Sequence, residues 1–346
     1  MYLHQINPHG GDVFDKEISL DFSSNINPSG IPQTVKEAIV GSAENCDVYP
    51  DPYCRRLRES ISAYEKIQYD RILCGNGAAE LIYAYAYSLE DDRPALIVAP
   101  TFCEYQTALC AARKSVEYYL LREDSDFTLN EDIMNTDLSR YSAVFLCTPN
   151  NPTGIAVDPE LLYELAQTGV RVFADMCFLD LTDEPDRYEL PKLIETYPNV
   201  TVLKAFTKSY AMAGVRLGYA LCTDAAFLER MSEKTQCWNV STVAQQTGIA
   251  ATNSGGWLKN SVKTIKAERE RMTGILRSCG IKVYPSEANY LLLHTNIDLY
   301  ERLLQRRILI RDCSDYIGLS KGYYRVAVRT KDENDMLLTA IKEVIQ

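Results

Sequence analysis

Short apolar, β-rich runs alternate with segments of helical composition from about residue 70 to residue 222, and this alternation constrains the fold more than any other feature. Residues 78–89 and 159–167, for example, have helical composition. Such alternation predicts βαβ units and an α/β fold, a mostly parallel sheet with helices on both faces, in which ligands gather at the carboxyl ends of the strands. The predicted strands are residues 71–74, 95–100, 115–121, 143–148, 171–175, 200–206 and 217–222.

The two ends of the chain predict a second, smaller α+β unit. Residues 1–44 have the pattern of an irregular arm followed by one helix, and residues 224–274 have the pattern of a long helix. Beyond them, predicted strands alternate with helices at residues 297–305 and 333–345. We therefore expect an N-terminal arm that contributes to the small domain (1–44), a large ligand-binding domain (45–235), and a linking helix with a small C-terminal domain (236–346). The strands predicted in the small domain are residues 282–284, 290–294, 308–311 and 324–328.

Charge and cysteine content exclude several classes of protein. A net charge of -11, spread along the chain, argues against nucleic acid or an anionic membrane surface as a partner. No apolar run approaches the roughly 18–20 residues that a membrane span needs, and the start of the chain lacks the pattern of a signal peptide. The eleven cysteines form no CxxC pair and the three histidines have no ligand-like spacing, so we expect no metal site. A reducing cytoplasm fits these features best.

The stretch from Thr207 to Tyr219 places a lysine at a strand exit and a glycine-bounded arginine shortly after it. Small and apolar neighbours would partly desolvate Lys208, which lowers the pKa of its amine and favours the nucleophilic form. Arg216 can return to the same site and supply a fixed cation for a phosphate. Taken alone, Lys208 would more often be a surface residue.

Three further features follow predicted strands. Gly75 to Glu80 joins a strand to a helix, whose free N–H groups can bind an anion. The stretch Pro149 to Gly154 is a rigid turn that could aim the amide of Asn151 at a ligand. Asp175 ends an apolar strand, so its buried carboxylate needs a cation or good donors, and a pyridinium N–H would serve. Each of these features has a simpler structural interpretation when it is considered alone. The two glycine-containing stretches would be ordinary turns, and Asp175 would be the N-cap of a helix.

The order of these features resembles the fold-type I, aspartate-aminotransferase-like enzymes that depend on pyridoxal 5′-phosphate (PLP), and the resemblance covers nearly the whole chain. It implies that Lys208 holds PLP as a Schiff base, that Asp175 pairs with the pyridine nitrogen and that Asn151 donates to O3′. It also implies that Arg216 binds the cofactor phosphate together with the helix start. Further residues that match cofactor contacts of the family are Ala78 and Ala79 at that helix start, Phe102 stacked on the ring, and Thr207 at the phosphate.

Two other positions carry expectations from the same resemblance. Tyr49, in Tyr49-Pro50-Asp51-Pro52, matches a tyrosine that reaches the phosphate in the neighbouring subunit, which implies a homodimer. Many relatives have tyrosine three residues after the aspartate, where this chain has Phe178. Asn151 would then be the main donor to O3′ besides the Schiff-base proton.

Anion-binding residues at the chain ends bear on the reaction, because the cofactor residues serve amino transfer and decarboxylation alike. His9 and Asn25 lie in the N-terminal arm, and Arg311, Arg325 and Arg329 lie near the C-terminus. Three arginines and a histidine exceed the needs of one carboxylate, and arginine suits carboxylate and phosphate equally. The surplus predicts a small substrate with two anionic groups, such as a phosphorylated amino acid. A surface position for Arg329 or His9 is the alternative.

These end segments are similar to those of the L-threonine-O-3-phosphate decarboxylases of cobalamin biosynthesis, relatives of the histidinol-phosphate aminotransferases. The resemblance implies Arg325 at the substrate carboxylate, Arg311 and His9 at its phosphate, and (R)-1-amino-2-propanol O-2-phosphate as product. Ala213-Gly214 after the lysine is closer to the aminotransferase pattern, so histidinol-phosphate amino transfer is the alternative activity. A non-catalytic regulator would need a DNA-binding module, for which the chain offers no basic helix.

Overall fold

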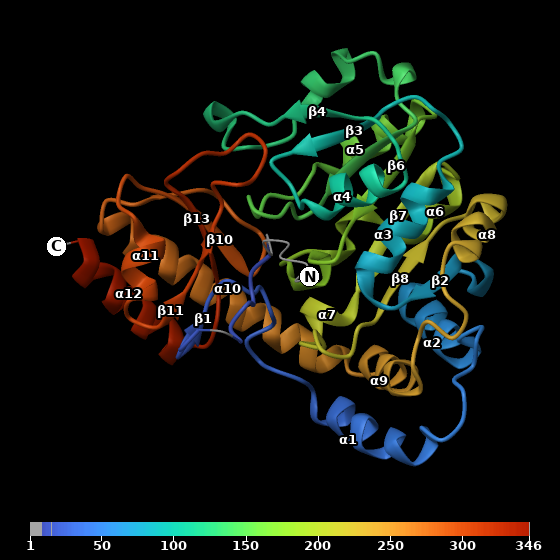
Figure 1. Ribbon diagram of the computed structural model, residues 1–346, viewed down its shortest axis with the longest axis horizontal. Coiled ribbons are helices and arrows are strands. Elements are labelled where there is room, and N and C mark those ends of the chain that lie inside the picture. Colours follow the sequence, from blue (N-terminus) through green and yellow to red (C-terminus); the bar gives the residue numbers. More distant parts are fainter. Residues whose placement is uncertain (1–8, 15, 346) are drawn as a thin grey trace, which may run out of the picture.

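A seven-stranded sheet forms the centre of the larger lobe, on the right in Figure 1. The computed structural model describes residues 9–14 and 16–345. The strands lie in the order β2-β8-β7-β6-β5-β3-β4, and β8 runs antiparallel to both of its neighbours while the others are mutually parallel. The predicted α/β fold with a mostly parallel sheet is therefore confirmed. The strands are β2 (Ile72–Gly75), β3 (Ala95–Ala99), β4 (Val116–Leu120), β5 (Ala143–Cys147), β6 (Arg171–Asp175), β7 (Val200–Ala205) and β8 (Gly218–Leu221).

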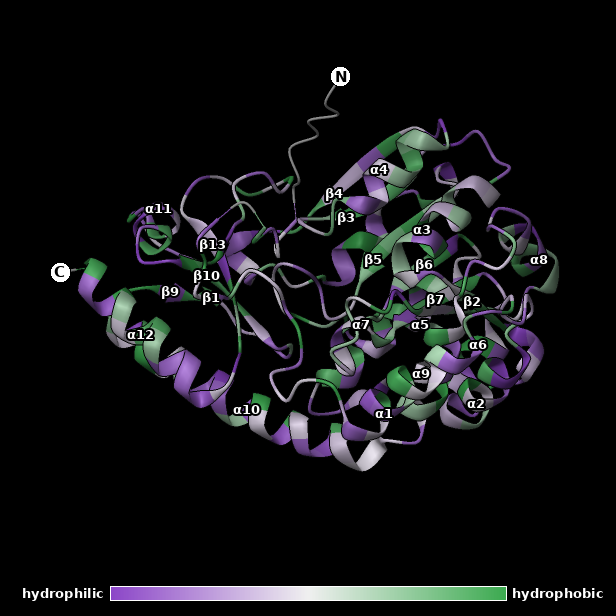
Figure 2. Ribbon diagram, turned by 60° about the horizontal axis from the view of Figure 1, so that its bottom comes forward, coloured by the Kyte–Doolittle hydropathy of each residue, from purple (hydrophilic) through white to green (hydrophobic). Residues whose placement is uncertain are grey.

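Alternate residues of the central strands pack into two separate cores, one on each face of the sheet. On β5, Val144 and Leu146 belong to one core, while Ala143 and Phe145 belong to the other. The first face is covered by α2 (Arg55–Glu65), α5 (Pro159–Gln167), α6 (Leu190–Thr196) and α9 (Thr242–Thr252). The second is covered by α3 (Gly77–Ser88), α4 (Glu104–Ala111) and α8 (Ala225–Glu233). Coverage on both faces explains why the inner strands β3 and β5 are continuously apolar in sequence, and β5 is green in the hydropathy colours of Figure 2.

The smaller lobe is a four-stranded sheet, in the order β12-β13-β10-β9, packed against helices. Its elements are β9 (Lys282–Val283), β10 (Tyr290–His294), α11 (Leu299–Leu304), β12 (Arg311–Asp312), β13 (Tyr323–Ala327) and α12 (Lys331–Ile345). The N-terminal arm joins this lobe, because β1 (Leu20–Asp21) pairs in parallel with β11 (Ile308–Leu309). The Phe22 carbonyl also accepts a hydrogen bond from the Ala327 amide, 2.9 Å away. The arm and the C-terminal strands thus form one structural unit.

The single long helix expected over residues 224–274 is wrong: this region forms α8, α9 and α10 (Gly255–Ser278). Trp238 has a left-handed backbone with φ 56°, which no helix continues. Ser241 then caps α9 by accepting a hydrogen bond from the Ala244 amide, and Ser254 precedes the start of α10. The 24-residue α10 runs from beneath the larger lobe to the smaller one in Figure 1.

The remaining helical elements are short. The arm leads into α1 (Gln33–Gly41), and α7 (Phe206–Ser209) follows β7. Single 3₁₀ turns occur at Ser42–Asn45, Tyr69–Arg71, Glu123–Ser125, Glu131–Asn135, Leu138–Arg140, Leu179–Leu181 and Pro185–Tyr188. Within the described ranges, none of the helices combines the length and the apolar character that crossing a bilayer requires.

Candidate active site

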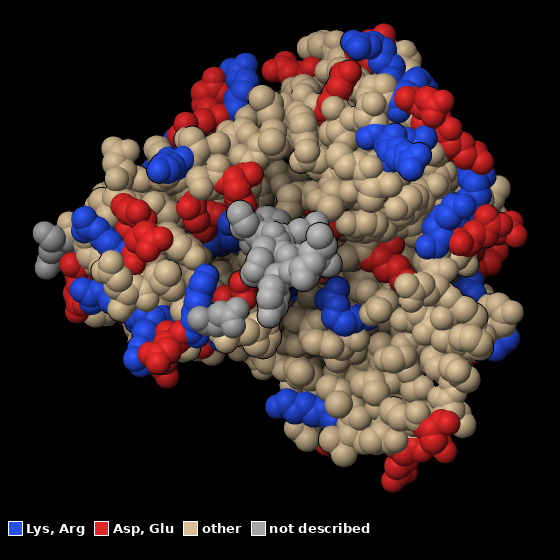
Figure 3. Space-filling model, in the orientation of Figure 1, with Lys and Arg blue, Asp and Glu red and all other residues tan. Residues whose placement is uncertain are grey.

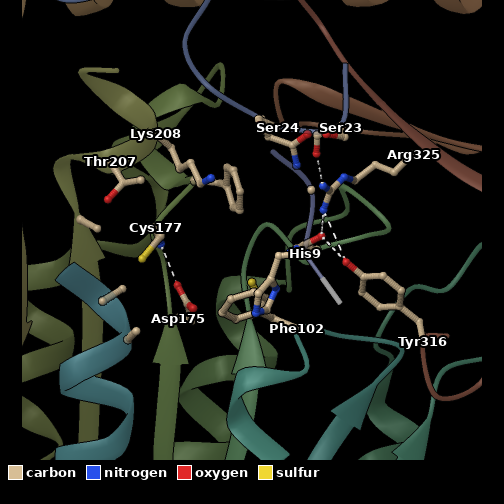
Figure 4. Close-up of a pocket in the computed structure, with 18 of the residues that line it drawn as sticks. His9, Ser23, Ser24, Phe102, Asp175, Cys177, Thr207, Lys208, Tyr316 and Arg325 are labelled. Carbon is tan, nitrogen blue, oxygen red and sulfur yellow. Dashed lines mark hydrogen bonds between the residues drawn. The ribbon is translucent and has the colours of Figure 1, made fainter. Parts of the chain in front are cut away.

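A cavity of about 230 Å³ lies where the carboxyl ends of the large-lobe strands face the small lobe and the N-terminal arm (Figure 4). Its lining residues come from segments that are far apart in the sequence. Eleven of the residues singled out by the sequence line it: His9, Asn25, Ala78, Ala79, Phe102, Asn151, Asp175, Thr207, Lys208, Arg216 and Arg325. The other lining residues are Gly10, Ser23, Ser24, Cys147, Cys177, Phe178, Ala205 and Tyr316.

The reversal between β7 and β8 brings Lys208 and Arg216 to one edge of the sheet. Lys208 follows the end of β7, and Arg216 precedes the start of β8, which returns antiparallel beside it. The first turn of α3, with Ala78 and Ala79, begins next to this pair, because β2 is the other neighbour of β8. One end of the cavity therefore combines free helix N–H groups with a guanidinium, which is an arrangement for binding an anion.

Two glycines make room for this anion-binding end. A Cβ on Gly77, whose φ is +79°, would lie 2.6 Å from the Arg216 guanidinium nitrogen Nη2. A Cβ on Gly218 would lie 2.9 Å from the Ala78 amide nitrogen. Both distances are shorter than any ordinary contact, so side chains here would displace the groups that can contact an anion.

Lys208 extends into the cavity, and its ammonium nitrogen lies 5.9 Å from the centre of the Phe178 ring. Burial, together with the Arg325 and Arg216 cations, lowers the pKa of Lys208 to about 8, against the Cys177 sulfur, which raises it. A substantial fraction of the amine is therefore neutral and nucleophilic near neutral pH.

Asp175 ends β6 at the floor of the cavity, 5 % exposed. Its carboxylate accepts hydrogen bonds from the Tyr105 hydroxyl at 2.7 Å and from the Cys177 amide at 3.0 Å. Burial raises the pKa of Asp175, although these two donors and Lys208 lower it. A buried carboxylate with two neutral donors and a raised pKa suits a ligand that brings a positive N–H.

Arg325 is buried on β13, on the opposite side of the cavity from Lys208 and Asp175 (Figure 4). Its guanidinium donates to the Ser23 carbonyl of the arm at 2.7 Å and to the side-chain oxygen of Asn151. Because that contact uses the oxygen of the Asn151 amide, the NH₂ group of the same amide can donate elsewhere. Asn25, 2 % exposed, has a side-chain oxygen with no hydrogen-bond partner among the described residues.

His9 lies at the front of the cavity, with its ring 5.4 Å from the Phe102 ring at 43°. The Cys103 sulfur and the Glu104 carboxylate raise the pKa of His9 to about 9, against burial, which lowers it. The imidazole is therefore cationic near neutral pH. The cavity thus has two cationic side chains, His9 and Arg325, in addition to Arg216 at its anion-binding end.

Three residues expected at the site do not line this cavity. Arg311 lies directly opposite Arg325 in the β12–β13 register, but it lines a neighbouring small cavity behind Tyr316 and pairs with Asp315 at 2.7 Å. Arg329 pairs with Glu333 at 2.7 Å and donates to the Asp21 carbonyl. Tyr49 is 78 % exposed and stacks on Trp238 at a centroid distance of 4.5 Å.

Sequence reasoning missed Tyr105, Cys177 and Tyr316. The Tyr316 hydroxyl lies 3.3 Å from the Asn151 side-chain oxygen and 3.5 Å from Arg325, between the two cavities. Cys177, two residues after Asp175, could have been suspected from its position, whereas nothing in the sequence marks Tyr105 or Tyr316. Their roles arise from contacts between segments more than 60 residues apart.

Comparisons with known proteins agree with this geometry. The model of the aminotransferase class I and II family matches residues 17–341. A threonine-phosphate decarboxylase of Salmonella typhimurium is 35% identical over 97% of this chain and 96% of its own. Among solved structures, the histidinol-phosphate aminotransferase of Clostridium acetobutylicum has a TM-score of 0.88 at 31% identity, covering 94% of this chain and 99% of the other. The L-threonine-O-3-phosphate decarboxylase of Porphyromonas gingivalis has a TM-score of 0.83 at 24% identity, covering 94% and 98%.

Proposed function

The chain belongs to the class I and II aminotransferase family of PLP-dependent, fold-type I enzymes, and we propose that it decarboxylates L-threonine O-3-phosphate to (R)-1-amino-2-propanol O-2-phosphate, a step of cobalamin biosynthesis. The observation that carries the proposal is the pair of cationic side chains, Arg325 and His9, in the same cavity as Lys208. A substrate with a carboxylate and a phosphate offers one anion to each. Asn25, with its buried amide, is the proposed neutral contact.

The residues of the cavity fit PLP. Asp175 would hold the pyridine N–H, which supplies the cation that its buried carboxylate lacks. Arg216, Thr207 and the N–H groups of Ala78 and Ala79 would hold the phosphate, in the space that Gly77 and Gly218 leave open. When bound, PLP supplies an electron sink for the electron pair left by a bond broken at the substrate Cα.

The protein residues then determine which bond breaks. We propose that Arg325 holds the substrate carboxylate and His9 its phosphate, so that the carboxylate is fixed in the orientation for cleavage. Lys208, with its pKa of about 8, can hold a proton and deliver it to Cα after CO₂ has left. Phe178, whose ring centre lies 5.9 Å from the Lys208 nitrogen, has no hydroxyl and cannot supply that proton.

A second candidate is amino transfer from histidinol phosphate, which the similarity to the Clostridium acetobutylicum structure favours. The two are separated by incubating the PLP-loaded enzyme with threonine phosphate or serine phosphate, assaying CO₂ and amine, beside histidinol phosphate with 2-oxoglutarate. We expect CO₂ and aminopropanol phosphate from threonine phosphate. Glutamate formation from histidinol phosphate, without CO₂ from threonine phosphate, would overturn the proposal in favour of the aminotransferase.

Replacing Arg325 by lysine is expected to lower kcat/KM for threonine phosphate by roughly tenfold to 100-fold, since a charged hydrogen bond contributes roughly 1.5–3 kcal/mol. Lysine keeps the positive charge but lacks the planar guanidinium that donates to both the Ser23 carbonyl and the Asn151 side-chain oxygen. Steady-state kinetics on Arg325→Lys and Arg329→Lys measure this. A larger loss in Arg329→Lys, whose side chain pairs with Glu333, would contradict the assignment of the carboxylate to Arg325.

Replacing Gly77 by alanine is expected to weaken PLP binding at least about tenfold, because the new methyl group would displace the Arg216 guanidinium and strain a left-handed backbone. Gly169→Ala is the matched control: its φ is +80°, and an added Cβ meets nothing within 4 Å. Fluorescence titration of the two apoproteins with PLP measures the dissociation constants. Equal weakening in both variants would show that strain alone, and not the phosphate-binding space, is responsible.

The rate at which PLP attaches to the apoenzyme is expected to rise with pH, to reach half its maximum near pH 8 and to level off above about pH 9. Attachment needs the neutral amine, and the folded pKa of Lys208 is lowered from 10.5 to about 8, so the neutral form gains population through that value. Stopped-flow absorbance across pH 6 to 10 measures the rate. A rise that continues to pH 10 would mean that the lysine is not desolvated.

We also propose that the enzyme is a homodimer in which Tyr49 reaches the partner's site. Val48, Tyr49, Tyr53 and Trp238 are exposed in the single chain, and Tyr49 stacks on Trp238. Exposed apolar surface of this kind commonly lies at interfaces between subunits. The mass of the protein in solution tests the dimer.

On the face shown in Figure 3, acidic and basic side chains are interspersed, which gives no large basic surface there for a nucleic-acid partner.

A further inference from the structure

Three side chains of different ligand chemistry meet at the front of the cavity. The His9 imidazole lies between the Glu104 carboxylate, 2.9 Å from its Nε2, and the Cys103 sulfur, 3.9 Å from its Nδ1. One ligand atom from each residue lies within 4.8 Å of the others, and within the described part of the chain this is the one such group of metal-ligating side chains. Cys103 and Glu104 begin α4, whereas His9 comes from the N-terminal arm.

The geometry is close to that of a zinc site. Zinc takes thiolate at about 2.3 Å and imidazole or carboxylate at about 2.0–2.2 Å, so donors around a tetrahedral ion are roughly 3.3–3.8 Å apart. One ligand atom of each residue lies within 4.8 Å of the other two. The two imidazole nitrogens now face Glu104 and Cys103 separately, and a rotation of the ring would direct one of them to an ion held by those two side chains. A sulfur–nitrogen–oxygen donor set selects Zn²⁺ or a similar ion over Mg²⁺ or Ca²⁺.

The exposure of these three side chains and their surroundings also suit a bound metal ion. The side chains of His9 and Glu104 are 35% and 18% exposed, and Cys103 is partly exposed, so an ion can enter from solvent. The Phe102 ring lies beside the imidazole, with the two ring centroids 5.4 Å apart. Three protein ligands leave a fourth position for water or for an oxygen of a bound molecule.

We propose that His9, Cys103 and Glu104 form a Zn²⁺ site at the mouth of the active-site cavity, and that Zn²⁺ inhibits the enzyme by competing with the phosphorylated substrate for His9. The second half of the proposal rests on the proposed function, because it assigns the substrate phosphate to His9. A metal-bound imidazole has one ring nitrogen occupied, so that nitrogen can no longer donate a hydrogen bond to a phosphate.

Metal binding is tested on the PLP-loaded protein with Co²⁺, whose complex with a thiolate gives a charge-transfer band in the near ultraviolet. Difference spectra against the metal-free protein are expected to show this band saturating at one equivalent. Cys103→Ser is expected to lose the band and to weaken Zn²⁺ binding by about 100-fold in calorimetry, at the upper end of the effect of losing a supporting group. Cys110→Ser, which alters an exposed cysteine on the same helix, is the matched control and keeps both.

The visible cofactor absorption of each variant shows that it is folded and loaded. Absence of the band in the wild type, or its persistence in Cys103→Ser, overturns the site. Zn²⁺ inhibition that increasing threonine phosphate relieves supports the competition, and inhibition that it does not relieve overturns it. Failure of the proposed function is seen separately, as no CO₂ from threonine phosphate in metal-free enzyme, while the Co²⁺ spectra still decide the metal site.

Discussion

Lys208→Ala is expected to lower turnover of threonine phosphate by about 10⁴-fold or more, since it removes both the covalent attachment of the cofactor and the proposed proton donor. The side chain projects into the cavity, beside Phe178 and facing Arg325, where no other amine lies among the described lining residues. The protein should also lose the visible absorption of lysine-bound PLP. Single-turnover kinetics and an absorbance spectrum measure the two effects.

Lys208→Arg is the informative control. It keeps a cation in the cavity, but a guanidinium does not lose its proton in proteins and so cannot act as the nucleophile. We expect it to be as inactive as the alanine variant. Activity within tenfold of the wild type in either variant would refute the central role of this amine.

Asp175→Ala is expected to lower kcat by a factor of roughly 10² to 10⁴, the equivalent of the roughly 3–5 kcal/mol lost when one partner of a buried ion pair is removed. Without the carboxylate, nothing at the floor of the cavity keeps the cofactor nitrogen protonated, and the electron sink weakens. Asp175→Asn should lose nearly as much, because it retains the shape but not the charge. Single-turnover decarboxylation rates measure both.

Tyr105→Phe is expected to give a smaller loss of kcat than the Asp175 variants. It removes one hydrogen bond to Asp175, at 2.7 Å, and leaves the Cys177 amide in place, so we expect a loss of about tenfold, consistent with roughly 1 kcal/mol for such a bond. If Asp175→Asn were as active as Tyr105→Phe, the negative charge would not be what the site requires.

The large-lobe strands could be predicted because their signal is local. Each is a short apolar run bounded by turn residues, and every one of the seven lies within two residues of its predicted range. Once a parallel sheet is predicted, residues at strand ends must meet at one edge. Lys208, Asp175, Asn151 and Arg216 are brought together for this reason, although their individual roles stay predictions.

One of the two helix breaks in residues 224–274 has a signal in the sequence that the expectation of one long helix overlooked: residues 253–256, Asn-Ser-Gly-Gly, are typical of a turn. The other break has no glycine or proline; there α8 ends before Trp238, which adopts a left-handed conformation, and Ser241 caps the new helix α9. The helix α9 packs against α1 and α2, and this contact, which fixes the position of α9, joins segments about 200 residues apart in the sequence.

The cluster of His9, Cys103 and Glu104 at the cavity mouth shows a second limit of prediction from the sequence. Metal sites are sought in sequence by the spacing of histidine and cysteine, and that spacing led us to expect no metal site. His9 and Cys103 are 94 residues apart and meet because β1 pairs with β11 and holds the preceding part of the arm at the cavity, where His9 contacts the start of α4. Tyr316 escaped notice in the same way, since its neighbours Asn151 and Arg325 belong to different lobes.

Within one chain, the cavity residues proposed for the cofactor lie at the seven-stranded sheet, whereas Arg325 and His9 belong to the small lobe and to the N-terminal arm that pairs with it. The proposed cofactor residues and substrate residues therefore come from different parts of the chain and meet at the contact between Arg325 and Asn151. Exchanging the arm together with residues 308–329 for those of a relative should change the substrate selectivity, while the cofactor-binding residues of the large lobe stay unchanged.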